Sequence, residues 1–192
     1  SGVRAGAFRG CSCVSGQRGR GIRYFTRYGR DRGFMSVYSL LTTGNAVGEK
    51  LCYHDIPERL DPFDNEAFMA SSTAFYVGVT NLETGEGEYP RVTDLFKQMD
   101  WLRASASMPY VSRIVMLDGK PYLDGGIADS VPLAAFERLG YARNVVVLTK
   151  EEGFQRKRDN IPLPTFRYRK YPRFLATLAR RGALCDAEDR HI

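Results

Sequence analysis

The most constrained part of this chain is a predicted hairpin that ends in one carboxylate and a pair of glycines. Two short apolar runs, residues 114–117 and 120–123, flank Asp118-Gly119, a dipeptide that favours a tight turn between two strands. Asp124-Gly125-Gly126 follows the second run directly. Aspartate and glycine are also ordinary turn residues, so this tripeptide alone would suit a turn in a β-meander. The ordered sequence around it favours a functional carboxylate.

The rest of the chain alternates strand-like and helix-like segments. Runs of β-branched and aromatic residues predict strands, and apolar residues at helical spacing predict helices. The predicted strands are residues 74–80, 88–90, 114–117, 120–123 and 144–149. The predicted helices are residues 7–14, 22–28, 95–102 after the capping residue Asp94, 133–139 and 172–181, and residues 55–63, with two prolines, are predicted to form a surface loop. This alternation favours a three-layer α/β fold over a helical bundle or a β-sandwich.

The length and composition of the chain suit one domain. Its 192 residues, 43% of them apolar, are enough to close a core, so we expect a single domain over residues 1–192 with a frayed tail at 183–192. No apolar run approaches the roughly 20 residues that a membrane-spanning helix needs. The first residues do not form an export signal. We therefore expect a cytoplasmic protein, with attachment to a membrane surface as an open alternative.

Cysteine and histidine do not have the numbers or the spacing of a metal site. The two histidines are His54 and His191, and the four cysteines show no Cys-x-x-Cys spacing. The cysteines are Cys11, Cys13, Cys52 and Cys185. We expect free thiols rather than disulfides, and no bound metal.

The first residues have the spacing of a nucleophile elbow. Such an elbow reads Gly-x-Ser-x-Gly, because the nucleophile stands on a sharp turn between a strand and a helix and its neighbours must be small. Gly2 and Gly6 supply the two glycines, and Arg4 stands where the serine would be. A guanidinium stays protonated and cannot attack a carbonyl carbon. Ser12 and Ser15 follow without flanking glycines in this pattern, so we do not expect them to replace it.

These two motifs, with several further segments, resemble the patatin-like phospholipase family, and in particular its bacterial branch. Residues 102–109, rich in serine and alanine and ending in a proline, precede the hairpin and Asp124 as in that family. The other matching segments are residues 15–19, 60–64, 79–85 and 169–172. The resemblance runs from Gly2 to about Arg181 and implies a patatin-like three-layer α/β/α sandwich.

The resemblance implies a lipid acyl hydrolase that uses a serine–aspartate dyad without histidine. Asp124 would be the general base, Arg4 would occupy the nucleophile position, and Gly125 and Gly126 would let the backbone pass close to the base. The substrate would be a lipid or another ester, and no cofactor is implied. In the family, a first strand and a glycine-rich oxyanion loop precede the elbow, so we expect a chain that begins at Ser1 to be shortened at its N-terminus.

The arginine at the nucleophile position, Arg4, indicates that this chain is catalytically impaired. We hypothesise that its guanidinium forms an ion pair with Asp124, because both residues occupy the family's dyad positions. Such a pair would stop the carboxylate from acting as a base.

Positive charge is concentrated at both ends of the sequence. Residues 1–32 contain eight arginines and one acid, and a second basic stretch covers residues 150–181. Such charge attracts anionic lipid head groups, nucleic acid or acidic proteins, although a solvated basic surface is commoner. An alternative function is therefore a pseudoenzyme that binds lipid or an anionic membrane surface. Its acyl-chain cleft would include Phe8, Met108 and Tyr110, which are explained more simply as core residues.

Nucleic-acid binding is the least favoured alternative. Residues 166–174 mix aromatic and basic side chains, which could stack on bases and contact phosphates. No recognised nucleic-acid motif accompanies them, so we favour a structural segment whose aromatic residues pack. No feature of the sequence specifies an oligomeric state.

Overall fold

A computed structural model describes residues 1–147 and 165–191 of the chain, with the side chains of residues 166–182 in the second range. The helices are α1 (Ala5–Val14), α2 (Arg20–Tyr28), α3 (Val37–Thr43), α4 (Asn65–Ala70), α5 (Met99–Ala106), α6 (Leu133–Arg138) and α7 (Pro172–His191). The π-helical segment is η1 (Leu51–Leu60), and the 3-10 turns are η2 (Gly125–Ile127) and η3 (Thr165–Tyr168). The strands are β1 (Phe75–Tyr76), β2 (Val79–Asn81), β3 (Gly87–Glu88), β4 (Arg91–Val92), β5 (Val115–Leu117) and β6 (Lys120–Asp124).

The main sheet has four antiparallel strands in the order β3-β2-β6-β5. β5 and β6 form the predicted hairpin: Asp118 and Gly119 have φ values of 50° and 77°, the left-handed backbone that favoured two-residue hairpin turns use. The predicted return strand is β3, which pairs with β2. β2 also pairs with β6, and Val79 lies opposite Asp124. The candidate base therefore stands at the end of a central strand.

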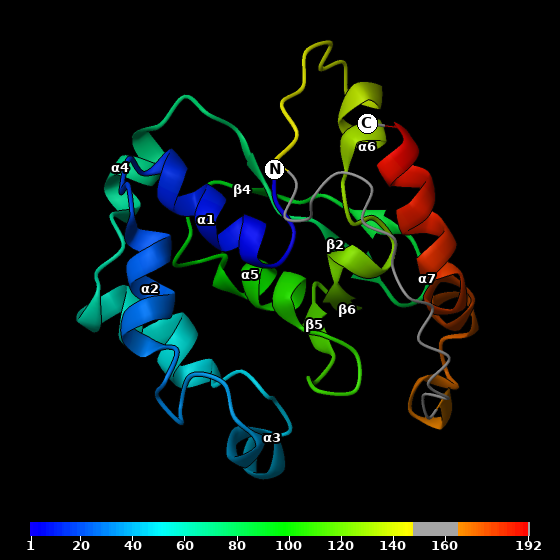
Figure 1. The fold of residues 1–192 in the computed structure, drawn as a ribbon, viewed down its shortest axis with the longest axis horizontal. Coiled ribbons are helices and arrows are strands. Elements are labelled where there is room, and N and C mark those ends of the chain that lie inside the picture. The colour runs from blue at the N-terminus through cyan, green and yellow to red at the C-terminus, as the bar shows by residue number, and fades with distance from the viewer. Residues whose placement is uncertain (148–164, 192) are drawn as a thin grey trace.

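Helices cover both faces of this sheet. α1 and α5 lie on one side of the strands and α7 on the other (Figure 1). Tyr122 of β6 packs in the larger core beside Trp101 of α5, with ring centroids 5.1 Å apart, while Leu123 packs with Tyr168 and Phe174 in a second core. One strand serves both cores because its side chains alternate between the two faces. The structure confirms the predicted α/β class with helices on both faces of a sheet.

The prediction of a strand at residues 144–149 is wrong for residues 144–147, the part of this segment that the structure describes. Residues 144–147 are irregular, and the side chains of Val145 and Val147 are 94% and 85% exposed. An apolar run without alternation suits a strand that is buried on both faces. Such burial needs neighbouring strands, and none of the described strands pairs with this segment. Residues 148 and 149 lie outside the described residues.

Three further expectations need correction. Residues 55–60, predicted as part of a surface loop, belong to η1, because Ile56 and Pro57 are buried and hold this segment against the core. The strand expected at 74–80 is split at Val77 and Gly78, where the chain pairs with Gly2 instead. The helix expected from residue 95 begins at Met99; Asp94 accepts a hydrogen bond from the Lys97 N–H, 3.3 Å away, in the turn before it.

The remaining predicted helices are present. α1, α2 and α6 match their expected ranges within a few residues, and α6 ends just before Gly140, whose φ is 91°. α7 begins at the expected Pro172 and continues past the expected end at residue 181 to His191. Within the described part of the chain, none of the helices combines the length and apolar character needed to cross a bilayer.

Candidate active site

Arg4 stands at a sharp corner between extended chain and helix α1. Gly2 forms a parallel bridge to Val77: its N–H donates to the Tyr76 carbonyl at 3.1 Å, and its carbonyl accepts from the Gly78 N–H at 3.0 Å. Arg4 then has φ 52° and ψ −123°, outside the helical and extended regions, and α1 begins at the next residue. Residues with side chains rarely adopt such a conformation. The predicted elbow geometry is therefore present, with Arg4 at its corner.

The two elbow glycines differ in what their surroundings require. A Cβ on Gly2 would lie 2.5 Å from the carbonyl carbon of Gly6 and 2.6 Å from the Ala7 nitrogen, so a side chain there would push the strand away from the helix. A Cβ on Gly6 would meet nothing within 4 Å. Gly2 is needed for close backbone packing, whereas Gly6 leaves open space beside the elbow.

Asp124 is held at the end of β6 by backbone groups. Its N–H donates to the Ser107 carbonyl at 2.9 Å, and its Oδ1 accepts from the Gly126 N–H at 2.9 Å. A Cβ on Gly125 would lie 2.2 Å from the Gly78 carbonyl oxygen, so the double glycine does allow the close backbone approach expected from the sequence. The Asp124 side chain is completely buried. Its carboxylate is thus fixed in position and removed from water.

Arg4 and Asp124 form the hypothesised ion pair. The Nε and Nη2 atoms of Arg4 both contact Oδ2 of Asp124. The Arg4 side chain remains 36% exposed, so the charge of a buried carboxylate is balanced by a guanidinium that still reaches solvent. Hydrogen bonds between charged partners are stronger than neutral ones. Oδ1 is engaged by the Gly126 N–H and Oδ2 by Arg4, so both oxygens of the candidate base are occupied.

Two further side chains complete the site, and the sequence reading did not identify their roles. Ser105, fully buried at the end of α5, accepts a hydrogen bond from the Arg4 N–H at 3.1 Å. Arg181 of α7 donates from Nε to the Gly126 carbonyl at 3.2 Å. Ser105 lies within the serine- and alanine-rich segment that carried part of the family resemblance, which is a usable signal. No sequence signal connects Arg181 with Gly126, because 55 residues separate them.

The serines after the elbow are not placed as substitute nucleophiles. The Ser12 hydroxyl donates to the Phe8 carbonyl at 3.3 Å, and the Ser15 hydroxyl donates to the Ser12 carbonyl at 3.2 Å. Both side chains are buried and satisfied by the turns of α1.

Two of the residues considered for an acyl-chain cleft, Phe8 and Tyr110, pack in different cores. Phe8 packs in the larger core against Tyr24 and Tyr53, with ring centroids 5.9 and 5.6 Å away. Tyr110 packs in the second core against Tyr168, with ring centroids 5.3 Å apart. A cavity of about 850 Å³ lies beside α3. Neither Arg4 nor Asp124 lines it, and the three candidate cleft residues Phe8, Met108 and Tyr110 do not line it either. The simpler interpretation of Phe8 and Tyr110 as core residues is confirmed.

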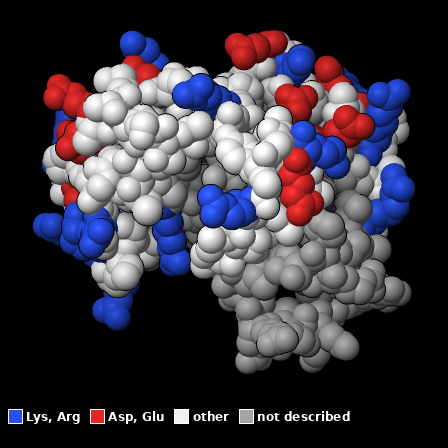
Figure 2. All heavy atoms as spheres, turned by 90° about the horizontal axis from the view of Figure 1, so that it is seen from above, with Lys and Arg blue, Asp and Glu red and all other residues white. Residues whose placement is uncertain are grey.

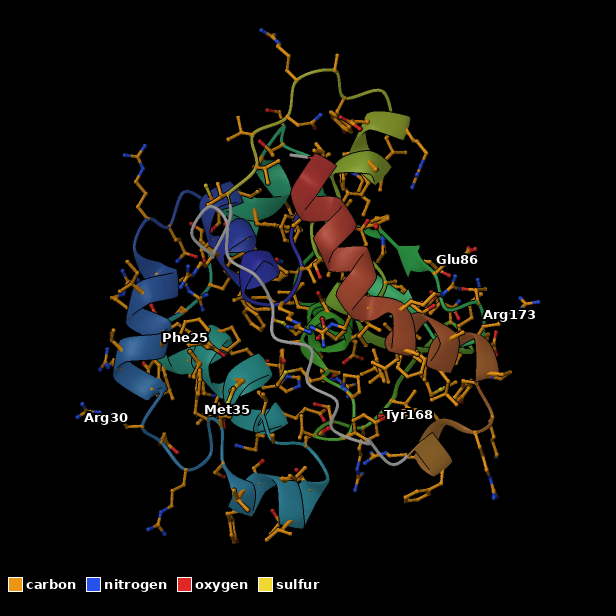
Figure 3. The ribbon with its side chains drawn as sticks, turned by 45° about the vertical axis from the view of Figure 1, so that its right-hand side comes forward. Phe25, Arg30, Met35, Glu86, Tyr168 and Arg173 are labelled. Atoms are coloured by element: carbon orange, nitrogen blue, oxygen red, sulfur yellow. The ribbon has the colours of Figure 1, made fainter. Side chains whose placement is uncertain are left out.

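The aromatic and basic segment 166–174 is also largely structural. Tyr168 and Phe174 are completely buried, with ring centroids 5.1 Å apart. The Tyr168 hydroxyl accepts a hydrogen bond from the Tyr110 N–H at 3.0 Å. These rings fix η3 and α7 against the sheet, on the right-hand side of Figure 3, and cannot stack on bases.

Comparison with known proteins agrees with this geometry. A family model described as patatin-like phospholipase matches residues 1–137, a range that includes the elbow, Ser105 and the Asp124 loop. No curated protein matches the chain. The matched range is well over half of the 192 residues. The chain belongs to the patatin-like phospholipase family.

Proposed function

We propose that this chain is a catalytically silent member of a lipid acyl hydrolase family. The family relationship implies lipid esters as the substrate class. The single observation that supports silence is the ion pair of Arg4 with Asp124, which joins the nucleophile position to the candidate base. The same elbow and acid loop that would build an active site are retained, while the reacting groups neutralise one another.

The chemistry of acyl transfer explains why this pair is inhibitory. A serine hydroxyl becomes a useful nucleophile when a base removes its proton as the bond to the carbonyl carbon forms. The ester then loses its alcohol, and water, activated by the same base, releases the acid. Arg4 carries no nucleophilic lone pair, and its guanidinium occupies the Asp124 oxygen that would receive the proton. Both the attack and the later activation of water are therefore blocked.

The first test is hydrolysis of a short-chain fluorogenic ester by the unchanged protein, with Asp124→Asn as its matched control. We expect no turnover above the uncatalysed rate in either protein. Turnover by the unchanged protein that disappears in Asp124→Asn would refute the proposal, because another nucleophile would then be working with this carboxylate.

Restoring the hydroxyl tests the same proposal from the opposite side. Arg4→Ser places a serine at the elbow corner and frees the carboxylate of Asp124. We expect this variant to be labelled by a fluorophosphonate probe, and Arg4→Ser/Asp124→Asn to be labelled at least tenfold more slowly, in line with the usual contribution of a general base. Equal labelling of both variants would argue against Asp124 as the base.

A further inference from the structure

A group of large apolar side chains is exposed where α2 is followed by α3. We call it the α2–α3 face. It consists of Phe25, Met35, Val37, Tyr38 and Leu41. Val37 and Leu41 are 72% and 80% exposed, more than most apolar residues of the described chain. Contiguous exposed apolar groups of this kind mark interaction sites more often than scattered single residues do.

These residues belong to one surface because the buried residue Phe34 and the segment after it connect α2 with α3. Phe34 is buried, and its ring lies 5.7 Å from the ring of Phe25. Met35 follows it, pairs with Val47, and leads directly into α3. In Figure 3, Phe25, Met35 and Arg30 lie on the same side of the molecule, away from Tyr168.

Helix α3 presents most of its apolar side chains outward. Ser39 is buried and Leu40 is half-buried, while Val37, Tyr38 and Leu41 face solvent. A helix that serves the core of its own domain shows the reverse arrangement, with the apolar stripe inward. The exposed positions of Val37, Tyr38 and Leu41 are therefore not explained by folding of the described chain.

Exposed positive charge lies in the same stretch of chain as these apolar side chains. Arg27, Arg30 and Arg32 are exposed, and among residues 1–147 and 166–182 no carboxylate forms an ion pair with any of them. The nearby acid Asp31 accepts a hydrogen bond from the Gly33 N–H at 2.7 Å. Basic side chains also project from the left-hand side of the molecule in Figure 2, the side on which α2 lies in Figure 1.

The cavity beside α3 adjoins this region. Arg32 and Tyr38 are two of its lining residues. Its other cations Lys50 and Arg113 are accompanied by the acids Glu49 and Asp55, and Asp55 forms an ion pair with Lys50. The α2–α3 face thus combines aliphatic groups and aromatic rings with neighbouring exposed arginines that form no ion pair among the described residues.

We propose that the α2–α3 face docks on an anionic phospholipid bilayer. Aliphatic side chains can enter the acyl boundary while arginines contact lipid phosphates and serine carboxylates, the combination that holds interfacial helices on membranes. Charge complementarity selects an anionic surface. A nucleic acid would use the arginines and rings but gives Val37 and Leu41 no apolar partner. The proposal concerns a surface without Arg4 or Asp124, so it is independent of catalytic silence.

The test is co-sedimentation of the protein with vesicles of phosphatidylcholine alone or with about one third phosphatidylserine. We expect binding to the anionic vesicles that weakens at least tenfold as ionic strength rises from about 0.05 to 0.5 M, because salt screens the arginines. Leu41→Asp removes an apolar contact and Arg30→Glu reverses a charge, and each is expected to weaken binding about tenfold.

Matched controls come from α6. Leu139→Asp and Arg138→Glu make the same chemical changes at exposed residues, and α6 lies at the top of Figure 1 whereas α3 lies at the bottom. These variants should bind as the unchanged protein does, and circular dichroism should show all five proteins folded. Equal loss in the control variants and in the variants of the α2–α3 face, or undiminished binding of Leu41→Asp, would overturn the proposal. So would a dimer, without vesicles, that Leu41→Asp dissociates.

Discussion

Replacement of Arg4 by alanine should destabilise the protein through the charge that it leaves behind. In the folded chain the Asp124 carboxylate is completely buried and has two kinds of partner, the Arg4 guanidinium and the Gly126 N–H. Arg4→Ala removes the first and leaves a buried negative charge with one protein donor. Arg4→Ala/Asp124→Asn removes the charge as well, because an asparagine oxygen can still accept from Gly126.

The magnitude follows from the burial of the two partners. Removing one member of a fully buried ion pair costs roughly 3–5 kcal/mol. The Arg4 side chain is 36% exposed, so water can enter the space it leaves, and we expect about 2–3 kcal/mol for Arg4→Ala. Asp124→Asn should cost about 1 kcal/mol, because Arg4 can turn to solvent. The double variant should lose less than the sum, giving a coupling of about 1–2 kcal/mol.

Urea unfolding of the four proteins measures this coupling. The exposed pair Lys50 and Asp55, with Nζ and Oδ2 2.7 Å apart and side chains 83% and 26% exposed, supplies a control cycle that should give below about 1 kcal/mol. A coupling for Arg4 and Asp124 no larger than about 0.3 kcal/mol would mean that the pair contributes nothing to stability, and the reasoning from burial would be wrong.

Two other perturbations test the packing. Gly125→Ala would bring a Cβ within 2.2 Å of a backbone carbonyl oxygen, so it should lower the free energy of unfolding by about 2 kcal/mol or more. Gly6→Ala has open space around its Cβ and lies in helix α1, so urea unfolding should show no loss or a gain of up to about 1 kcal/mol. Equal losses in the two variants would contradict the packing at the acid loop. Burial raises the pKa of the Cys11 and Cys52 thiols from 9.0 to about 11. Because the folded pKa exceeds the unfolded one, their stabilisation is complete below about pH 9 and is lost as the pH rises through about 11, by on the order of 2–3 kcal/mol per thiol. Urea unfolding at pH 8 and pH 10.5 should show the fall, and equal stabilities would contradict it.

Local sequence was sufficient for those parts of the fold that depend on neighbouring residues. The β5–β6 hairpin follows from Asp118-Gly119, because both turn residues must adopt a left-handed backbone that these types tolerate. The ends of α6 and the start of α7 follow in the same way from glycine and proline. The elbow spacing located Arg4, and the double glycine located Asp124.

Local sequence failed where burial was decided by distant chain. Residues 144–147 are as apolar as a buried strand, yet no described strand pairs with them and Val145 is exposed. η1 contains a proline and mixed charges that suggest a loop, yet Ile56 is completely buried and anchors it. The outward apolar residues of α3 could not be distinguished from core residues by pattern, because pattern does not say which face the rest of the chain covers.

The sequence by itself determined the family resemblance and the α/β class, and it predicted which two residues occupy the dyad positions. It also supported the hypothesis that those two residues meet. The tertiary structure decided how they meet: the Asp124 oxygens are shared between Arg4 and Gly126, Ser105 holds the elbow backbone, and Arg181 from the last helix holds the acid loop. Apart from the local bond between Gly126 and Asp124, these contacts join residues 55 to 120 positions apart. A one-dimensional pattern records the residue types at a site, whereas hydrogen-bond partners and burial depend on how distant segments pack.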